Sequence, residues 1–504
     1  MTSEISGKRR WYALVVLCLG VLMIVLDTTI VNVALPSIAA ELRFSENALV
    51  WVVNAYMLTF GGCLLLGGRL GDLYGHRRLF LAGVTVFTAA SLACGLAQTQ
   101  LMLIAARAAQ GIGGAVVSSV ALSLIMTLFV EPGDWAKAMG VYGFVYAGGG
   151  SLGVLLGGLL TSALSWHWVF LVNLPLGAVV YLLSSALLPK ARAQATRAPL
   201  DIAGAVTAAL MLAVYAVVNG NAAGWLSART LSWLGGAAAL FAAFVAIEAR
   251  VAHPLMPLAL CMKRNVAIAN LIGILWAAAM FAWFFLAALY LQRVLGYGPL
   301  QIGLAFLPAN LIMGVFSLIV SALLVVRFGI RVPIAAGLLA AAAGLMLFAR
   351  APVGGDFVAD VLPGMILLGT GAGIAFNPVL LAAMSGVDPA DSGLASGIVN
   401  TSFMMGGALG LAVLASVATA RTDALLAART AVPAAMAGGY HAAFMLGAAF
   451  AIVAALIGMR LRAARIRRRC RGCKARRSSA VPSRGELGRC VRPASSIGVF
   501  DRQV

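Results

Sequence analysis

Fourteen apolar runs, each about long enough to cross a lipid bilayer, follow one another along this chain of 504 residues. A membrane-spanning helix needs about 20 mostly apolar residues, and hydrocarbon admits only helices or closed β-barrels. Continuous apolar runs lack the alternation of barrel strands, so we expect an all-α, polytopic membrane protein. The expected spans are Trp11–Leu35, Ala48–Gly68, Leu79–Leu96, Leu101–Phe129, Ala136–Leu160, Trp166–Leu188, Ile202–Val218, Leu231–Ile247, Val266–Leu291, Leu300–Val326, Val332–Phe348, Phe357–Met384, Leu394–Ala420 and Tyr440–Met459.

The composition excludes a soluble enzyme. Hydrophobic residues make up 62% of the chain, charged residues only 10%, and the mean hydropathy is +0.99. Soluble domains carry about 25% charged residues. The net charge is +20, and more than half of that excess lies from Arg460 onward. This basic tail, residues 460–504, is predicted to be disordered.

The basic residues between the spans predict the orientation. Fifteen lysines and arginines before the tail fall on one side, including Lys8, Arg77 and Arg331, and six fall on the other. Loops rich in Lys and Arg stay cytoplasmic, so both termini are expected in the cytoplasm. The first apolar run is too long for a signal peptide and is expected to remain as a helix.

Short matches between the two halves of the sequence indicate an internal repeat. Gly75-His76-Arg77 recurs as Gly329-Ile330-Arg331 at an offset of 254, and Gly153 and Gly157 recur as Gly406 and Gly410 at 253. Gly111-Ile112-Gly113 is matched with Gly371-Ala372-Gly373 at 260. We therefore expect a 6 + 2 + 6 arrangement of helices. Its parts are an N-terminus (1–10), a first six-helix bundle (11–188), a linker with two extra helices (189–265), a second bundle (266–459) and the tail.

Two ionisable residues stand well inside apolar spans. Asp27 lies about eight residues from the outer end of the first span, and Arg107 lies about six residues into the fourth. At 1.5 Å per residue they are roughly 12 and 9 Å deep and able to face one cavity. Burial disfavours a charged carboxylate and a nearby guanidinium favours it, so such a pair suits proton coupling. A purely structural ion pair and, for Arg107, snorkelling to the interface remain alternatives.

Four segments resemble a known family, in the right order along the chain. They are Leu26–Pro36, Gly68–Arg78, Arg107–Ala115 and Trp166–Pro175. From Trp11 to Met459 the sequence is similar to the fourteen-helix drug:proton antiporters of the major facilitator superfamily. The resemblance implies multidrug or antibiotic efflux through the cell (inner, plasma) membrane by alternating access. It also implies a proton gradient as the driving force, without a cofactor.

The resemblance also implies roles for individual residues. Asp27 corresponds to the protonatable residue of the first helix and Arg107 to the buried arginine of proton coupling. Asn32 and Gln110 correspond to polar residues of the substrate cavity.

The loop after the second span corresponds to the family's gating loop. Its matching residues are Gly68, Gly71, Asp72, Gly75 and Arg77, and Asp72 and Arg77 would join a cytoplasmic charge network. Leu73 departs from the basic residue common in the family. Independently of the resemblance, glycines allow a tight turn between two helices, and arginines beside it act as positive-inside anchors.

Glycines repeat every four residues in the fifth span, at Gly149, Gly153 and Gly157, and Gly158 extends the stripe. Such a stripe permits close helix approach. It corresponds to the family's antiporter motif, except that Val154 replaces the proline after the central glycine. A special role in antiport and plain helix packing are both compatible with this pattern.

The substrate is less constrained by the sequence. Apart from Asp27 no acidic residue lies well inside a span, which favours neutral or singly charged lipophilic small molecules. Asn377 and aromatic residues such as Phe376, Trp276 and Trp283 are candidate cavity residues, although packing explains aromatic residues equally well. We expect a monomer in the lipid bilayer, with no metal and no nucleic-acid partner.

Two other function classes remain for comparison. A proton-coupled symporter or facilitator for a small metabolite would share the fold and differ in the direction of flux. A membrane enzyme is disfavoured, because the sequence has no HExxH or P-loop pattern and its four histidines are scattered.

Overall fold

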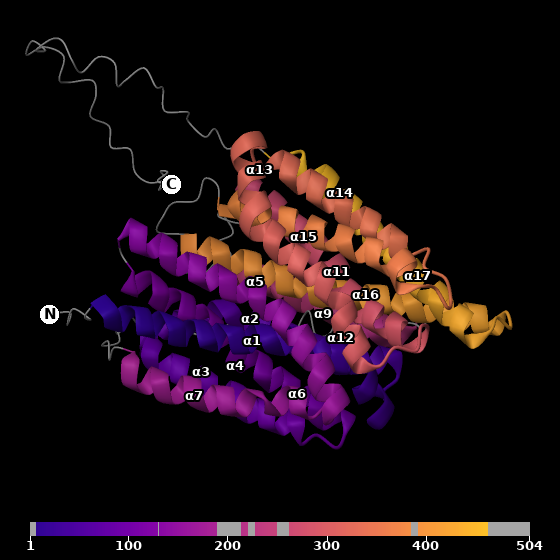
Figure 1. Cartoon of the computed structure of the whole chain (residues 1–504), viewed down its shortest axis with the longest axis horizontal. Coiled ribbons are helices and arrows are strands. Elements are labelled where there is room, and N and C mark those ends of the chain that lie inside the picture. Colours follow the sequence, from indigo (N-terminus) through magenta and orange to yellow (C-terminus); the bar gives the residue numbers. More distant parts are fainter. Residues whose placement is uncertain are drawn as a thin grey trace, which may run out of the picture.

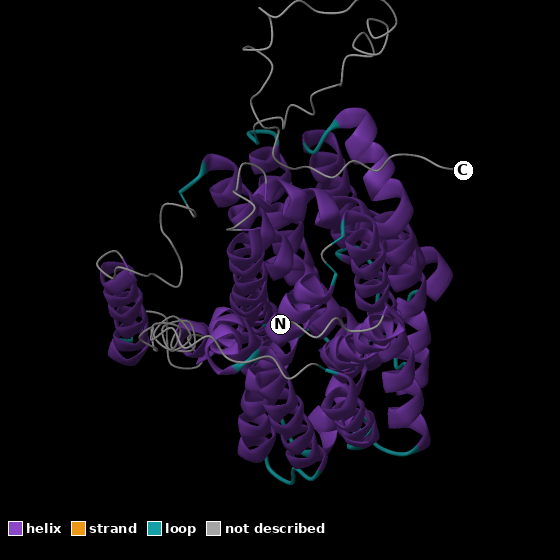
Figure 2. Cartoon of the chain, turned by 90° about the vertical axis from the view of Figure 1, so that its left-hand side faces the viewer, coloured by secondary structure: helices purple, strands orange, loops and turns teal. Residues whose placement is uncertain are grey.

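The computed structural model describes residues 7–129, 131–188, 213–219, 227–248, 262–384 and 392–461. Within these ranges the chain is helical, without strands (Figure 2). The helices are α1 (Gly7–Glu41), α2 (Glu46–Tyr74), α3 (His76–Gly95), α4 (Gln100–Leu128), α5 (Pro132–Ala163), α6 (Trp168–Leu171), α7 (Asn173–Leu187), α9 (Ala228–Glu248), α11 (Arg264–Arg293), α12 (Pro299–Val315), η1 (Phe316–Val320), α13 (Ser321–Phe328), α14 (Arg331–Phe348), η2 (Phe357–Val361), α15 (Leu362–Met384), α16 (Ser392–Ala427) and α17 (Val432–Gly458). The prediction of an all-helical membrane protein is confirmed.

Twelve helical stretches in the described ranges are long and apolar enough to cross a membrane. Two further expected spans are described only in part. Helix α5 contributes the shorter apolar stretch Leu152–Ala163, and residues 213–219, at the end of the expected seventh span, are helical. The structure is therefore compatible with fourteen spans. The basic tail lies outside the described residues beyond Leu461.

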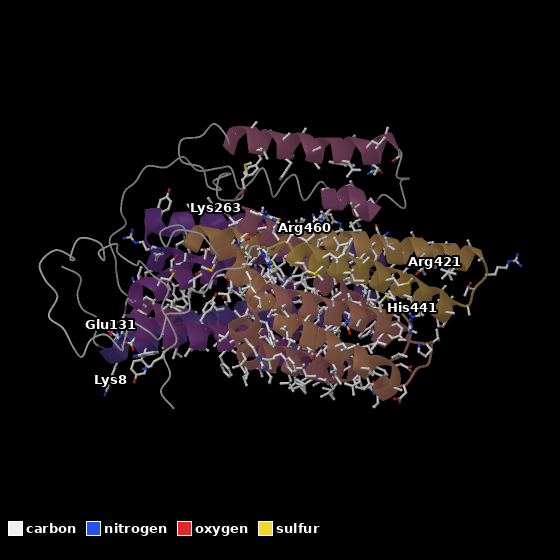
Figure 3. The ribbon with its side chains drawn as sticks, turned by 90° about the horizontal axis from the view of Figure 1, so that it is seen from above. Lys8, Glu131, Lys263, Arg421, His441 and Arg460 are labelled. Atoms are coloured by element: carbon white, nitrogen blue, oxygen red, sulfur yellow. The ribbon has the colours of Figure 1, made fainter. Side chains whose placement is uncertain are left out.

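The helices form two groups (Figure 1). Helices α1 to α7 pack on one another, and α11 to α17 do the same. Figure 3 shows α9 running beside the bundle at a distance from it, with Lys8 and Glu131 at one end of the molecule and Arg421 and His441 at the other. We call the end with Lys8 and Glu131 the terminal end, since α1 begins there.

Matching glycines make matching contacts in the two groups. A Cβ at Gly153 or Gly157 of α5 would lie 2.9 or 2.6 Å from the carbonyl oxygen of Leu26 or Ile30 on α1. A Cβ at Gly406 or Gly410 of α16 would lie 2.6 or 2.2 Å from the Cα of Ile274 or Ala278 on α11. The α1–α5 and α11–α16 pairs thus use the same close packing, as the internal repeat predicts.

The fourth and twelfth expected spans match at a different offset from the one predicted. Gly113 on α4 faces the backbone of Gly83 and Phe87 on α3, whereas Gly371 on α15 faces Gly337 and Ala341 on α14. Gly113 therefore pairs with Gly371, an offset of 258 rather than 260. The prediction was wrong by two residues because both spans contain Gly-x-Gly, which aligns in more than one way.

Local chemistry begins and ends several helices. The Ser45 hydroxyl accepts a hydrogen bond from the Ala48 amide at the start of α2, and Thr99 does the same for Met102 at the start of α4. Gly75 follows α2 with φ = 92° and Gly329 follows α13 with φ = 74°. Glycine adopts these positive φ angles without strain, so both turns depend on having glycine at these positions.

Three expected spans differ in detail. Trp166–Leu188 is broken at Val172 into α6 and α7, and Pro175 has no N–H to offer the carbonyl of Leu171. Leu300–Val326 contains the π-helical turn η1, where the Asn377 side chain donates to the Ser317 carbonyl. Helix α17 begins at Val432, eight residues before the expected start.

The two groups touch mainly away from the terminal end. There Gly158 of α5 packs on Pro299 and Gly303 of α12, and Thr419 of α16 donates to Asn47 of α2. Nearer the middle, the Asn54 amide donates to the Ala408 carbonyl at 3.0 Å. In Figure 1 the groups spread apart toward the side where the termini leave.

Candidate functional site

Asp27 lies in the middle of α1 with no exposed surface. Its carboxylate accepts three hydrogen bonds. Arg107 Nη1 donates to Oδ2 at 2.5 Å, and Gln110 Nε2 and Asn173 Nδ2 donate to Oδ1 at 2.7 and 3.1 Å. Charged groups survive burial only when they are paired and hydrogen-bonded, and Asp27 meets both conditions.

Hydrogen bonds and two aromatic rings fix the position of the Arg107 guanidinium. The side chain is 2% exposed, and besides Asp27 it donates from Nη1 to Gln110 Oε1 at 2.6 Å and from Nε to the Val52 carbonyl at 3.0 Å. Its guanidinium carbon lies 4.3 Å from the ring centre of Tyr56 and 5.7 Å from that of Phe170. Helices α1, α2 and α4 therefore meet at this side chain, and it does not snorkel to the surface.

Two further residues complete this polar network, and neither was predicted. The Ser91 hydroxyl on α3 accepts from Gln110 Nε2 at 2.7 Å and from Asn173 Nδ2 at 3.4 Å. Asn173 stands at the start of α7, in the family-like segment Trp166–Pro175, but nothing in the sequence singles out its side chain. Ser91 has no local signal at all. We call Asp27, Ser91, Arg107, Gln110 and Asn173 the buried network.

Each hydrogen-bond partner of the Asp27 carboxylate within the described residues is an N–H donor. A protonated carboxyl group must give up an acceptor site and find an acceptor for its own proton. Gaining or losing one proton therefore forces a change of hydrogen-bond partners among α1, α3, α4 and α7. Such an arrangement can couple protonation to helix movement.

Among the described residues, the second group of helices has no such network. With the glycine register, the positions that match Asp27, Ser91, Arg107 and Gln110 are Leu275, Leu345, Met365 and Leu368. All four are apolar, and the last three are fully or almost fully buried. The intramembrane charge chemistry that the structure describes is thus confined to the first group.

The residues expected to line a substrate cavity lie in different surroundings. Gln110 has no exposed surface and lies inside the buried network, so its predicted place at a cavity wall is corrected. Asp27 and Arg107 are likewise enclosed and not exposed to a shared cavity. Asn32 is 7% exposed and donates to the Thr28 carbonyl of its own helix. Asn377 is half-buried and bonds to the Ser317 hydroxyl at 3.0 Å.

The expected gating loop forms the α2–α3 turn at the terminal end. Gly68 and Gly71 lie in the last turns of α2, and Gly75 makes the turn itself. Arg77 donates to the carbonyl of Ser185 near the end of α7. The side chain of Asp72 lies outside the described residues, so its predicted pairing with Arg77 stays a prediction.

A related contact joins α1 to its neighbours at the same end. Arg9 donates to the Ala186 carbonyl at 3.0 Å, and Arg10 forms a salt bridge with Asp134. Arginines near a helix C-terminus satisfy its last carbonyls. The terminal ends of α1, α3, α5 and α7 are therefore tied together by arginine.

The glycine stripe of α5 faces two helices. Gly149, Gly153 and Gly157 lie against α1, and Gly158 lies against α12 of the other group. Val154 is 1% exposed, and α5 runs unbroken from Pro132 to Ala163. The stripe therefore places α5 against Asp27's own helix.

We expect Gly153→Ala to destabilise the protein, because its Cβ would overlap the Thr29 hydroxyl and sit 2.9 Å from the Leu26 carbonyl oxygen. Overpacking of this kind costs about 1 to 3 kcal/mol. Gly150→Ala is the matched control, since its Cβ meets only the Thr29 methyl group at 4.0 Å. Thermal unfolding in detergent should show a lower Tm for the first variant alone. Equal Tm values would contradict the packing described.

Asn173→Leu is expected to destabilise the protein. The substitution removes one of the three donors to the buried Asp27 carboxylate. A hydrogen bond to a charged group contributes about 1.5 to 3 kcal/mol. A lower Tm in detergent checks this.

Asn219→Leu provides the control for Asn173→Leu. The Asn219 amide donates to the Tyr215 carbonyl of its own helical segment. Its Tm should lie closer to that of the unsubstituted protein. An equal Tm for the two variants would show that the bond from Asn173 to Asp27 adds no stability.

Comparison with known families shows which family this fold belongs to. Residues 17–411 match the family model described as the Major Facilitator Superfamily. The match covers most of the chain, and the chain belongs to this family. It is therefore a multi-pass membrane transporter and not an enzyme.

The relatives include antibiotic resistance and export proteins of other bacteria. The chain is 40% identical to a puromycin resistance protein of Streptomyces alboniger, over 88% of this chain and 89% of that protein. It is also 40% identical to a cephamycin export protein of Amycolatopsis lactamdurans, over 88% and 91%. A multidrug resistance protein, Stp, of Mycobacterium tuberculosis is 37% identical over 83% and 78%.

Solved structures share the fold at low sequence identity. One is an auto-inhibited peptide transporter of the POT family, with a TM-score of 0.63, 15% identity and coverage of 97% of this chain and 99% of that one. Another is a bacterial homologue of the lysosomal transporter Spinster, with a TM-score of 0.62, 17% identity and coverage of 90% and 97%. These likenesses support the fold alone.

Proposed function

We propose that this chain exports hydrophobic drugs or antibiotics by proton antiport and confers resistance to them. The observation that carries the proposal is the buried network, in which Asp27 is enclosed and bonded to Arg107, Gln110 and Asn173. Two relatives, a puromycin resistance protein and a cephamycin export protein, support antibiotics as the substrate class.

The proposed cycle follows from the chemistry of the network. When Asp27 is ionised, Arg107 and the two amides hold α1, α3, α4 and α7 together. Protonation from the outer side weakens the attraction to Arg107 and changes the hydrogen-bond partners. The helices then rearrange against the second group, and the proton leaves toward the cytoplasm while the substrate leaves outward.

The proposal includes the position of the chain in the membrane. Both termini are cytoplasmic in the cell's plasma membrane, so the terminal end faces the cytoplasm. The 6 + 2 + 6 division places residues 11–188 and 266–459 in the two bundles and residues 189–265 in a linker. The protein works as a monomer, and the proton gradient replaces any cofactor.

The roles of the remaining site residues are part of the proposal. The turn of Gly68, Gly71, Asp72, Gly75 and Arg77 gates the cytoplasmic side, supported by the bond from Arg77 to α7. The stripe of Gly149, Gly153, Gly157 and Gly158 lets α5 move between α1 and α12, on both of which it packs. Asn32 and Asn377 face the substrate path during the cycle.

One observation favours a second function, a proton-coupled symporter or facilitator for a small metabolite. Val154 stands where related antiporters have proline, and α5 is unbroken. Without that proline the fifth helix lacks the kink linked to tight antiport. The two functions differ in the direction of substrate flux.

The test is the accumulation of a panel of lipophilic antibiotics in drug-sensitive cells that express the protein, with and without a protonophore. Antiport predicts lower accumulation that the protonophore restores. If no compound on a broad panel is excluded, the export proposal fails, and radiolabelled uptake of small metabolites then tests the symporter.

A further inference from the structure

Residues 213–219 belong to the part of the chain that connects the two helix groups, between α7 and α11. They are helical and lie between α9 and the bundle (Figure 3). Val214, Ala216 and Val218 are at most 3% exposed, whereas Phe241 of α9 is 52% exposed. These residues, which we call the crossing segment, are therefore packed into the bundle.

The crossing segment contacts both helix groups at once. The ring centre of Tyr215 lies 6.4 Å from that of Trp51 on α2, a helix of the first group. The Ser416 hydroxyl of α16, a helix of the second group, donates to the Val217 carbonyl at 2.7 Å. Tyr215 also lies 5.2 Å from Trp233 of α9, so the segment joins α9 to both groups.

These two contacts lie at the same depth along the line where α2 meets α16. On α2, Trp51 stands between Asn47 and Asn54, the residues that form hydrogen bonds with α16. On α16, Ser416 stands between the two residues that they bond to. The crossing segment therefore spans the α2–α16 contact on the half that lies away from the terminal end.

Alternating access requires the two groups to separate at each end in turn. When α2 and α16 separate away from the terminal end, a segment of seven residues can follow only one of them. It then loses either the ring contact with Trp51 or the hydrogen bond from Ser416. Because these contacts exist together only while this end is closed, they stabilise the closed state relative to the open one.

We propose that the crossing segment is a latch that holds the outer side of the transporter closed. Its strength sets how the molecules divide between the outer-closed and outer-open states. The inference rests on alternating access, which is part of the proposed function. It gives the connection between the two helix groups a role in the cycle besides joining them.

The experiment measures single-molecule energy transfer in the full-length protein in lipid nanodiscs, without a proton gradient or a drug. The dyes are attached through azide-bearing amino acids, because the chain contains seven cysteines. The outer pair of dyes replaces Leu101 and Arg421, which are exposed on α4 and α16. The terminal pair replaces Tyr74 and Val326, which are exposed near the ends of α2 and α13.

Tyr215→Ala and Ser416→Ala each remove one contact of the latch. Each should raise the ratio of outer-open to outer-closed molecules about threefold to tenfold, the effect of losing one ring pair or one hydrogen bond. The outer dyes should move apart and the terminal dyes should move together in the same fraction of molecules.

Two substitutions are matched controls. Tyr215→Phe keeps the ring that faces Trp51, and Ser232→Ala removes a hydroxyl that donates within α9. Both should give the dye distances of the unsubstituted protein.

The inference is overturned if neither Tyr215→Ala nor Ser416→Ala changes the distance between the outer dyes. It is also overturned if the outer dyes move apart while the terminal dyes stay in place, because simple loss of packing would do that. If both dye pairs shift but the protein exports no antibiotic, the latch stands and the proposed function fails. If antibiotics are exported and no variant shifts the dyes, only the latch fails.

Discussion

Asp27→Asn is expected to abolish proton-driven export while the chain still inserts in the membrane. Asparagine has nearly the same shape but neither binds nor releases a proton. Its amide N–H groups would also face the donors that now serve the carboxylate. Substrate export under an imposed proton gradient should fall about a hundredfold or more, to the level of vesicles without the protein.

The same substitution leaves Arg107 buried without its counter-charge. Removing one partner of a buried ion pair lowers the stability of a protein by about 3 to 5 kcal/mol. Gln110 and the Val52 carbonyl would still accept hydrogen bonds from the guanidinium. The double variant Asp27→Asn with Arg107→Gln removes both charges. It should recover most of the thermal stability and remain inactive. Recovery of transport together with stability would show that Asp27 acts only in folding.

Arg107→Ala is expected to cause the second largest loss. The Asp27 carboxylate would keep two amide donors but lose the cation that it is paired with in the buried network. We expect export to lose its dependence on pH and to fall about a hundredfold. Proton flux and substrate flux measured together in proteoliposomes check both effects.

Arg107→Lys separates charge from geometry. A lysine ammonium can reach Asp27, but it cannot also donate to Val52 and lie flat against Tyr56. Export should be reduced about tenfold and keep its pH dependence. If Arg107→Ala transports with an unchanged pH profile, the ion pair is structural and proton coupling lies elsewhere.

Much of the fold could be predicted from hydropathy alone, because a lipid bilayer imposes helix length and polarity so strictly. The internal repeat could also be recognised in the sequence, because close helix packing requires glycine. Gly153 and Gly157 recur as Gly406 and Gly410. The break between α6 and α7 and the π-turn η1 were not predicted. The break lies four residues before Pro175, whose effect on the helix was not considered, and the π-turn depends on a tertiary contact, the Asn377 bond to Ser317, that leaves no periodic signal.

The candidate site was predicted in part for the same reason. Asp27 and Arg107 are conspicuous because charge inside hydrocarbon is costly, and their similar depth suggested that they meet. Ser91 and Asn173 are ordinary polar residues in membrane helices, so only the packing of α3 and α7 shows their function. Gln110 was expected at a cavity wall, because sequence shows which residues are polar but not which face of a helix is enclosed.

The most direct test of the account is proton release in proteoliposomes that contain the purified protein and a pH-sensitive dye. Adding a transported antibiotic under an imposed pH gradient should start a proton flux opposite to the substrate flux. The flux should vanish in Asp27→Asn and in the stable double variant with Arg107→Gln. Substrate movement without proton flux, or proton flux that survives both substitutions, would contradict antiport through Asp27.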